Sequence, residues 1–96
     1  MAPVVIGSLT VTLQIPNSQS LKEKRSVLSR IKARLHNEYN VSVAETGHHD
    51  AWQRAELTAC VVSADRRHAE SVLSTIDRVV ATAAGCRVID SVRAFF

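Results

Sequence analysis

Hydrophobic and polar residues alternate along four stretches of this chain, and two other stretches carry hydrophobic residues at helical spacing. Alternation with a period of two predicts a strand that buries one of its sides. It covers residues 5–15, 40–46, 52–63 and 87–95. Hydrophobic residues three and four positions apart predict amphipathic helices, and this spacing covers residues 20–37 and 65–83.

Turn and capping residues separate these stretches. Ser18 or Ser20 can cap the first helix and Asp65 the second, because a side-chain oxygen accepts a hydrogen bond from the free N–H groups of a first turn. Asn37 and Gly85 tolerate the left-handed conformation that often follows a helix. We therefore expect the first helix to close at Asn37 and the second to stop before Gly85.

The elements follow one another as strand, helix, strand, strand, helix, strand. A short turn at residues 47–50 joins the second and third strands, which should form an antiparallel hairpin. Right-handed crossovers through the two helices place both helices on one face of the sheet. The pattern predicts a single α+β domain over residues 1–96. It is a ferredoxin-like βαββαβ sandwich with a four-stranded antiparallel sheet in the order 4-1-3-2.

The two faces of this sheet should differ in polarity. The apolar set should face the helices, and it comprises Leu9, Val11, Leu13, Val41, Val43, Leu57 and Val61. The core should also include Leu28, Ile31 and Ile76. The open face should hold Thr10, Thr12, Gln14, Ser42, Ala44, Glu56, Thr58 and Cys60. RNA-recognition domains of this topology stack bases on aromatic residues of this face, and none is present here. We expect a solvated or self-associating face. Trp52 beside the turn should pack over the end of the core, and the alternative is a surface anchor for a partner.

Composition narrows the class of protein. A chain of 96 residues with 46% hydrophobic residues can bury one core. No apolar run approaches the roughly 20 residues that span a bilayer, and we expect no signal peptide. Cys60 and Cys86 lie apart from each other and from any zinc-ligand spacing, which favours free thiols in a reducing compartment. We expect a cytoplasmic protein with no disulfide and no membrane contact.

The net charge is +3, and cationic residues concentrate on the first helix. That helix carries Lys22, Lys24, Arg25, Arg30, Lys32 and Arg34 against Glu23 and Glu38. A surplus of cations can neutralise phosphates. Our candidate nucleic-acid-binding residues are Lys22, Lys24, Arg25 and Arg54. The cations spread over most of the exposed arc, so the alternative is an ordinary solvated helix with Lys24 lying along the core.

Candidate catalytic and metal sites are weak. His48, His49 and Asp50 are zinc or copper ligand types, but adjacent residues on one turn seldom converge on one ion, so we predict a polar turn without metal. Glu45 and Glu56 could face each other across the hairpin, although facing carboxylates alone do not make an acid–base pair. No nucleophile motif or phosphate-binding loop is present. We expect no catalytic residue, no cofactor and no enzymatic activity.

Four stretches of the sequence resemble the YlxP-like family of small bacterial proteins. They are SQSLKEKR at residues 18–25, NVSVAE at 40–45, DAWQR at 50–54 and SADRRH at 63–68. The resemblance implies a ferredoxin-like fold, in agreement with the pattern above. Genes of this family of unknown function often lie beside those of translation-initiation and ribosome-maturation factors, which implies a link to translation or RNA. The matching positions are Ser20, Leu21, Lys22, Lys24, Arg25, Asn40, Ser42, Glu45, Asp50, Gln53 and Arg54, and the resemblance assigns them no catalytic role.

These observations predict a non-enzymatic factor, associated with translation or the ribosome, that binds structured RNA through its basic first helix. The first alternative is a self-associating protein-interaction module, a homodimer through the open sheet face or an edge strand. The second is a small regulatory domain that binds a metabolite. The basic helix favours RNA, the bland open face favours self-association, and no motif supports a metabolite.

Overall fold

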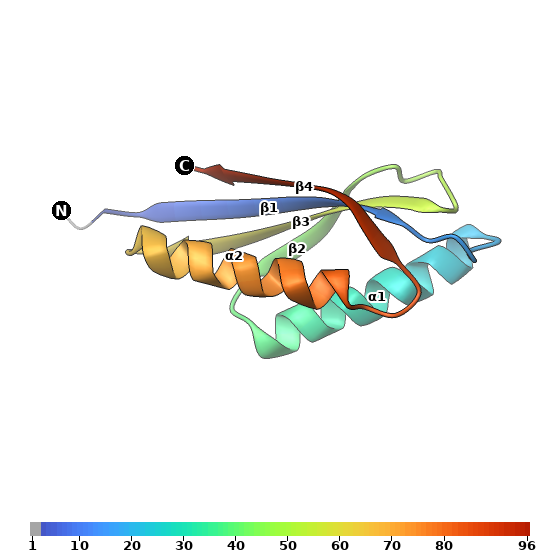
Figure 1. Cartoon of the computed structure of the whole chain (residues 1–96), viewed down its shortest axis with the longest axis horizontal. Coiled ribbons are helices and arrows are strands. Elements are labelled where there is room, and N and C mark those ends of the chain that lie inside the picture. The colour runs from blue at the N-terminus through green and yellow to red at the C-terminus, as the bar shows by residue number, and fades with distance from the viewer. Residues whose placement is uncertain (1–2) are drawn as a thin grey trace.

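The computed structural model describes residues 3–96, which form two helices and four strands (Figure 1). In chain order these are β1 (Val5–Gln14), α1 (Leu21–Glu38), β2 (Ser42–Gly47), β3 (Arg54–Ser63), α2 (Arg66–Ala81) and β4 (Arg87–Phe95). The predicted order of elements is confirmed, and the last strand has the predicted bounds.

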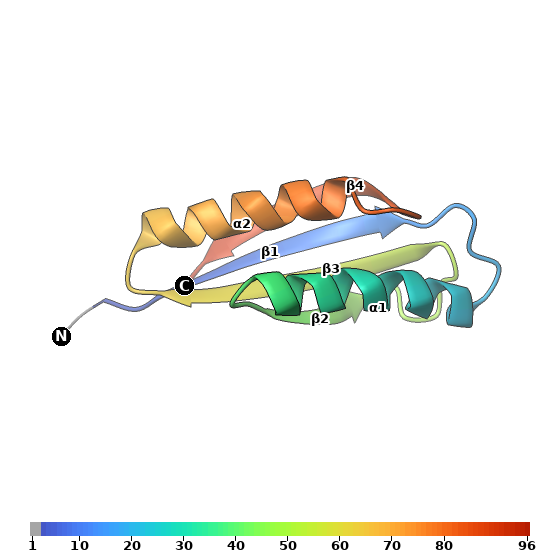
Figure 2. The same cartoon turned by 90° about the horizontal axis from the view of Figure 1, so that it is seen from below.

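The four strands form one antiparallel sheet in the order β2-β3-β1-β4. Both helices cover the same face, with α1 on the β2 side of the sheet and α2 on the β1 and β4 side (Figure 2). The opposite face carries no helix (Figure 1). This arrangement is the ferredoxin-like βαββαβ sandwich, so the predicted fold class and strand order are confirmed.

The core lies between the two helices and the covered face of the sheet. Every predicted core residue on the helices and central strands is buried, namely Leu9, Val11, Leu13, Leu28, Ile31, Leu57, Val61 and Ile76. Burial of one such aliphatic side chain contributes about 1.5–3 kcal/mol. Val41 and Val43 are only partly buried, because β2 is an edge strand and α1 alone covers it.

Both helices begin at predicted capping residues, whereas the first helix does not end at the predicted residue. The Ser20 and Asp65 side chains accept hydrogen bonds from the main-chain N–H of Glu23 and Arg67. The expectation that Asn37 closes α1 in a left-handed conformation is wrong. The helix continues through it to Glu38, and His48 is the only non-glycine with positive φ in residues 3–96. No helix in this described part is long and apolar enough to cross a membrane.

The hairpin differs from its prediction at both ends of its turn. β2 extends to Gly47 and β3 begins only at Arg54, so the loop between them spans residues 48–53. A bulge shifts the pairing between Glu45 and Gly47. Before this bulge the register is regular and sets Glu45 opposite Leu57, on the covered face, while Glu56 lies on the open face opposite Gly47. The expected facing of Glu45 and Glu56 is therefore wrong.

The two cysteines lie at opposite ends of the sheet. Cys60 on β3 is opposite Ser8 of β1, and Cys86 precedes Arg87, which is opposite Gln14. Ser8 and Gln14 are six positions apart, which corresponds to about 20 Å along a strand. A disulfide requires Cα atoms within about 7 Å, so the topology keeps the two thiols free.

We expect thiol titration of the unfolded, unreduced protein to find both cysteines free. In the folded protein Cys86 should be alkylated slowly at neutral pH, because burial raises the pKa of its thiol and the thiolate is the reactive form. Cys86→Ser should remove the slow phase and leave the rate at Cys60 unchanged. A titration that finds no free thiol would contradict the strand order.

We expect Leu28→Ala to lower the free energy of unfolding by about 2–5 kcal/mol, because the truncation leaves a cavity in the core. Urea denaturation followed by circular dichroism measures this change. Ser29→Ala on the adjacent, exposed position of α1 is the matched control and should change stability by less than about 0.5 kcal/mol. Equal stability of the two variants would show that the register of α1 is different.

Candidate nucleic-acid interface

Lys24, a predicted phosphate contact, is buried inside the protein. Only 1% of its surface is exposed, because it lies on the same side of α1 as the helix's buried leucines and isoleucine. Its ammonium Nζ donates hydrogen bonds to the main-chain carbonyl oxygens of His48 at 2.8 Å and Arg54 at 3.0 Å. The carbonyl oxygen of His49 lies at 3.5 Å. The three donors of Nζ therefore have acceptors within the protein.

Glu45 supplies the negative charge that balances this buried cation. Its carboxylate Oε2 lies 3.0 Å from Lys24 Nζ, and its side chain is 19% exposed. Within residues 3–96 this buried oxygen accepts no hydrogen bond, so the contact with Lys24 is a charge pair rather than a hydrogen bond. A buried charge without a partner costs several kcal/mol, which makes each member of the pair dependent on the other.

These contacts fix the loop of residues 48–53 against the start of α1. Gln53 makes two further hydrogen bonds there. Its main-chain oxygen accepts one from the main-chain N–H of Ile15 at 2.9 Å, and its side-chain amide donates one to the main-chain oxygen of Ser18 at 3.0 Å. Lys24 thus has a structural role at this end of the molecule. Its ammonium group has no free donor for a phosphate, so this part of the sequence prediction does not fit the structure.

Lys22 and Arg25 are exposed, and two further residues, Lys32 and His36, lie on the same side of α1. Lys22, Arg25, Lys32 and His36 are three, four or seven positions apart, which places them on one side of a helix with 3.6 residues per turn. We name these four residues the outer flank, because α1 lies over the β2 edge of the sheet (Figure 2). Lys32 is half-buried and the other three are exposed.

The carboxylates of α1 lie on the opposite flank. That flank carries Val27, whose methyl groups are the nearest side-chain atoms to Gly85 in the loop between α2 and β4. Glu23 and Glu38 fall on this side, and Arg34 Nε pairs with Glu38 Oε2 at 3.1 Å. Among the described residues, no member of the outer flank makes an ion pair. No carboxylate of the described residues therefore pairs with the positive charge of the outer flank.

Arg54, the last of the predicted residues, lies on the open face of the sheet. There it is exposed beside Gln14 of β1, which also neighbours Arg87 of β4. The next row of the same face holds Glu56 and Asp90, so two carboxylates lie close to the two guanidinium groups. The predicted set is therefore divided between the outer flank, the core and the open face. The spacing of Lys22, Arg25 and the later flank positions could have revealed this stripe.

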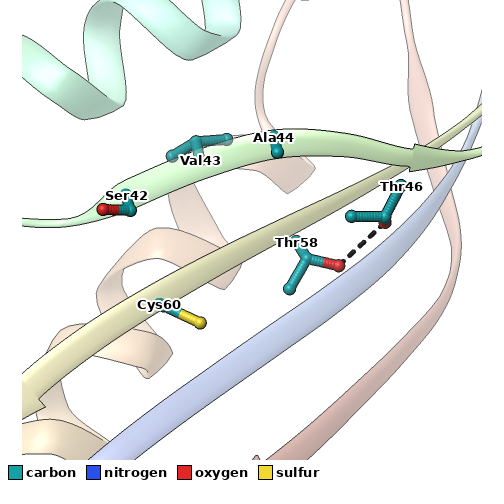
Figure 3. Close-up of a pocket in the computed structure, with 6 residues that line it drawn as sticks. All are labelled: Ser42, Val43, Ala44, Thr46, Thr58 and Cys60. Carbon is teal, nitrogen blue, oxygen red and sulfur yellow. Dashed lines mark hydrogen bonds between the residues drawn. The ribbon is translucent and has the colours of Figure 1, made fainter.

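The centre of the open face is polar and shallow. Thr58 lies 2.8 Å from Thr46 and 3.0 Å from Thr10 through their hydroxyl oxygens. Beside them is a hollow of about 190 Å³ (Figure 3), lined by Ser42, Val43, Ala44, Thr46, Thr58 and Cys60. Ligand pockets are usually about 300–1,000 Å³. The hollow is too small and too open to define a metabolite site.

The remaining predictions concern the loop of residues 48–53. Trp52 is 53% exposed, so its expected packing over the core is wrong; the loop leaves the sheet before Trp52 and holds it in solvent. His49 Nε2 lies 3.2 Å from the carbonyl oxygen of Glu45. In the part of the chain that the structure describes, no three His, Cys, Asp or Glu side chains come together as metal ligands.

The fold and these sites define a small ferredoxin-like domain with one basic helix flank. The chain belongs to the family described as "Protein of unknown function (DUF503)", whose model matches residues 6–93. It is 40% identical over 72 residues to "Uncharacterized protein YlxP" of Bacillus subtilis (strain 168), a match that covers 75% of this chain and 78% of that protein. The resemblance to the YlxP-like family is thereby confirmed.

Solved structures support the fold. The designed protein Foldit4 matches with a TM-score of 0.57 at 14% identity, over 98% of this chain and 97% of its own. The intact alpha subunit of aIF2 from Pyrococcus abyssi matches with a TM-score of 0.51 at 21% identity, over 94% of this chain and 35% of its own. At these identities the likeness concerns the fold alone.

We expect Lys24→Met to lower the free energy of unfolding by about 3–5 kcal/mol, because it leaves the Glu45 carboxylate and the loop carbonyls without a partner. The double variant Lys24→Met, Glu45→Met should regain part of this loss by removing the orphaned charge. Lys22→Met is the matched control and should be neutral. Urea denaturation of the wild type, Lys24→Met, Glu45→Met and the double variant measures the coupling, and additive effects of the Lys24 and Glu45 changes would refute the pairing.

Proposed function

We propose that this protein binds structured RNA along the outer flank of α1. The observation that carries the proposal is the separation of charge on this helix. Three cations and His36 lie on the outer flank, while both carboxylates of α1 lie on the other side. A run of cations without interspersed carboxylates attracts phosphate groups and releases their counterions.

The dimensions of the helix fit this role. α1 has 18 residues and is about 27 Å long at a rise of 1.5 Å per residue, so its flank can meet several phosphates of one RNA helix. The exposed cations of the flank are lysine and arginine, whose donors are suited to phosphate oxygens. The open face offers no aromatic platform in its central strands, so recognition relies on RNA shape rather than on base sequence.

The proposal places the protein among non-enzymatic factors of the cytoplasm. Structured RNA associated with translation is the ligand class that the family resemblance implies. Two free thiols support a reducing compartment. Lys24 and Arg54 are not part of the proposed interface, since one is enclosed and the other lies beside carboxylates on the open face.

We expect Lys22→Ala, Arg25→Ala, Lys32→Ala to reduce binding to a structured ribosomal RNA fragment. The slope of log K against log salt should flatten by about 0.7–0.9 for each phosphate that the variant no longer neutralises, or roughly two units in total. Filter binding or fluorescence anisotropy between about 50 and 200 mM salt gives the slope.

The control for this experiment is a second triple variant with the same loss of charge. Arg30→Ala, Arg67→Ala, Arg78→Ala removes three exposed cations that lie off the outer flank. It should bind with nearly the slope of the wild type. Equal weakening by the two variants would mean that net charge alone drives binding. No binding by the wild type at low salt would refute the proposed function.

A further inference from the structure

Exposed apolar side chains gather at one end of the open face, far from the outer flank. Phe96 is 76% exposed and exchanges two main-chain hydrogen bonds with Ile6 of β1, of 3.1 and 2.8 Å. Ile6 lies opposite Val62 of β3, which is also exposed. Val92, four positions before Phe96, is 57% exposed and lies opposite Thr10 on the same face. Contiguous exposed apolar residues mark interaction surfaces.

The outer edge of β4 is an open row of main-chain groups beside this apolar end. In an antiparallel pair, successive residues direct their N–H and C=O alternately toward the two sides of the strand. Since both main-chain groups of Phe96 bond to Ile6, those of Phe95, Arg93 and Ser91 point outward. The register with β1 is regular from Asp90 onward, so the outward main-chain groups of this half of the edge alternate without interruption, as pairing with another strand requires.

The other edge of the sheet is less suited to pairing between two copies. β2 has six residues and a bulge between Glu45 and Gly47. The outer flank lies over this edge, so two copies joined through β2 would bring the cations of both flanks together. Repulsion between these like charges opposes association.

We propose that this protein forms a homodimer in which the β4 strands of two copies pair antiparallel around a two-fold axis at Ala94. In this register Val92 lies opposite Phe96 of the partner copy, a pairing of a β-branched and an aromatic side chain that stabilises sheets. Arg93 and Phe95 of the partner copy then exchange main-chain hydrogen bonds. A register centred on Arg93 would oppose two arginines, which is unfavourable.

The helices on the covered face agree with this arrangement. α2 is the helix beside β4, and its Arg66 pairs with Glu70 while its Asp77 lies 3.8 Å from Arg93. Both signs of charge are therefore present where two α2 helices would approach each other. The two outer flanks would lie at the far ends of a continuous eight-stranded sheet, free to bind RNA, so the dimer does not depend on the proposed function.

The expected affinity is modest. Standard interfaces bury about 800 Å² on each partner, and smaller ones belong to weak or transient complexes. One half-strand and an apolar cluster of a few residues fall below that area, so we expect a dissociation constant in the micromolar range. Sedimentation equilibrium at about 200 μM should then give twice the chain mass of 10.5 kDa. A monomer at that concentration would overturn the proposal.

Two variant pairs distinguish this dimer from other assemblies. Arg93→Pro and Arg93→Ala both remove the side-chain contacts of Arg93, but only the proline variant also removes its outward N–H. The dimer of the proline variant should therefore be weaker than that of the alanine variant by about tenfold or more. Val92→Asp should abolish the dimer, whereas Ala44→Asp, exposed on the same face of the far edge strand β2, should leave it intact. Loss of the dimer in both aspartate variants would indicate packing through the open face and refute pairing through β4.

Cross-linking tests the register itself. In a background with Cys60→Ser and Cys86→Ser, Ala94→Cys places two thiols opposite each other across the two-fold axis, within the distance that a disulfide needs. Mild oxidation should give a covalent dimer. Ala44→Cys, exposed on the same face of the other edge strand, is the control and should stay monomeric under the same conditions. Equal cross-linking of the two cysteines would contradict the proposed register.

Discussion

The buried pair of Lys24 and Glu45 is the interaction on which the hairpin end of this molecule depends. An ammonium group can remain in a core only if fixed acceptors replace its water. Here α1 supplies the cation, β2 the carboxylate, and the β2–β3 loop and the first residue of β3 the carbonyl oxygens. Three segments are thereby held in one relative position. Replacing such a pair by apolar residues of similar volume is often neutral or stabilising, so the net contribution of the pair to stability is small.

The pairing of Lys24 also limits which cations of α1 are available to the proposed RNA ligand. Lys24 pairs with Glu45 inside the protein, and Arg34 pairs with Glu38 on the opposite flank of α1. Within residues 3–96 the α1 cations without an ion pair are Arg30 and those of the outer flank, where cations follow one another without a carboxylate between them.

The two edges of the sheet have opposite chemistry. The β2 edge lies beneath the outer flank, whereas the β4 edge ends in an apolar cluster around Phe96 and Val92. One cationic and one apolar edge keep the proposed RNA interface and the proposed dimer contact apart. The centre of the open face, between these edges, is hydroxyl-rich and shallow, and neither proposal uses it.

The periodicity of the sequence by itself determined the element order, the fold class, the core residues and the cap at Asp65. These features follow from local spacing, because a period of two or 3.6 residues states which side of an element is buried. Only the tertiary structure decided the roles of Lys24, Trp52 and Arg54. The carbonyl partners of Lys24 lie 24 to 30 residues away in the chain. A polar side chain can be buried only where distant segments bring it partners, and sequence spacing does not specify those partners.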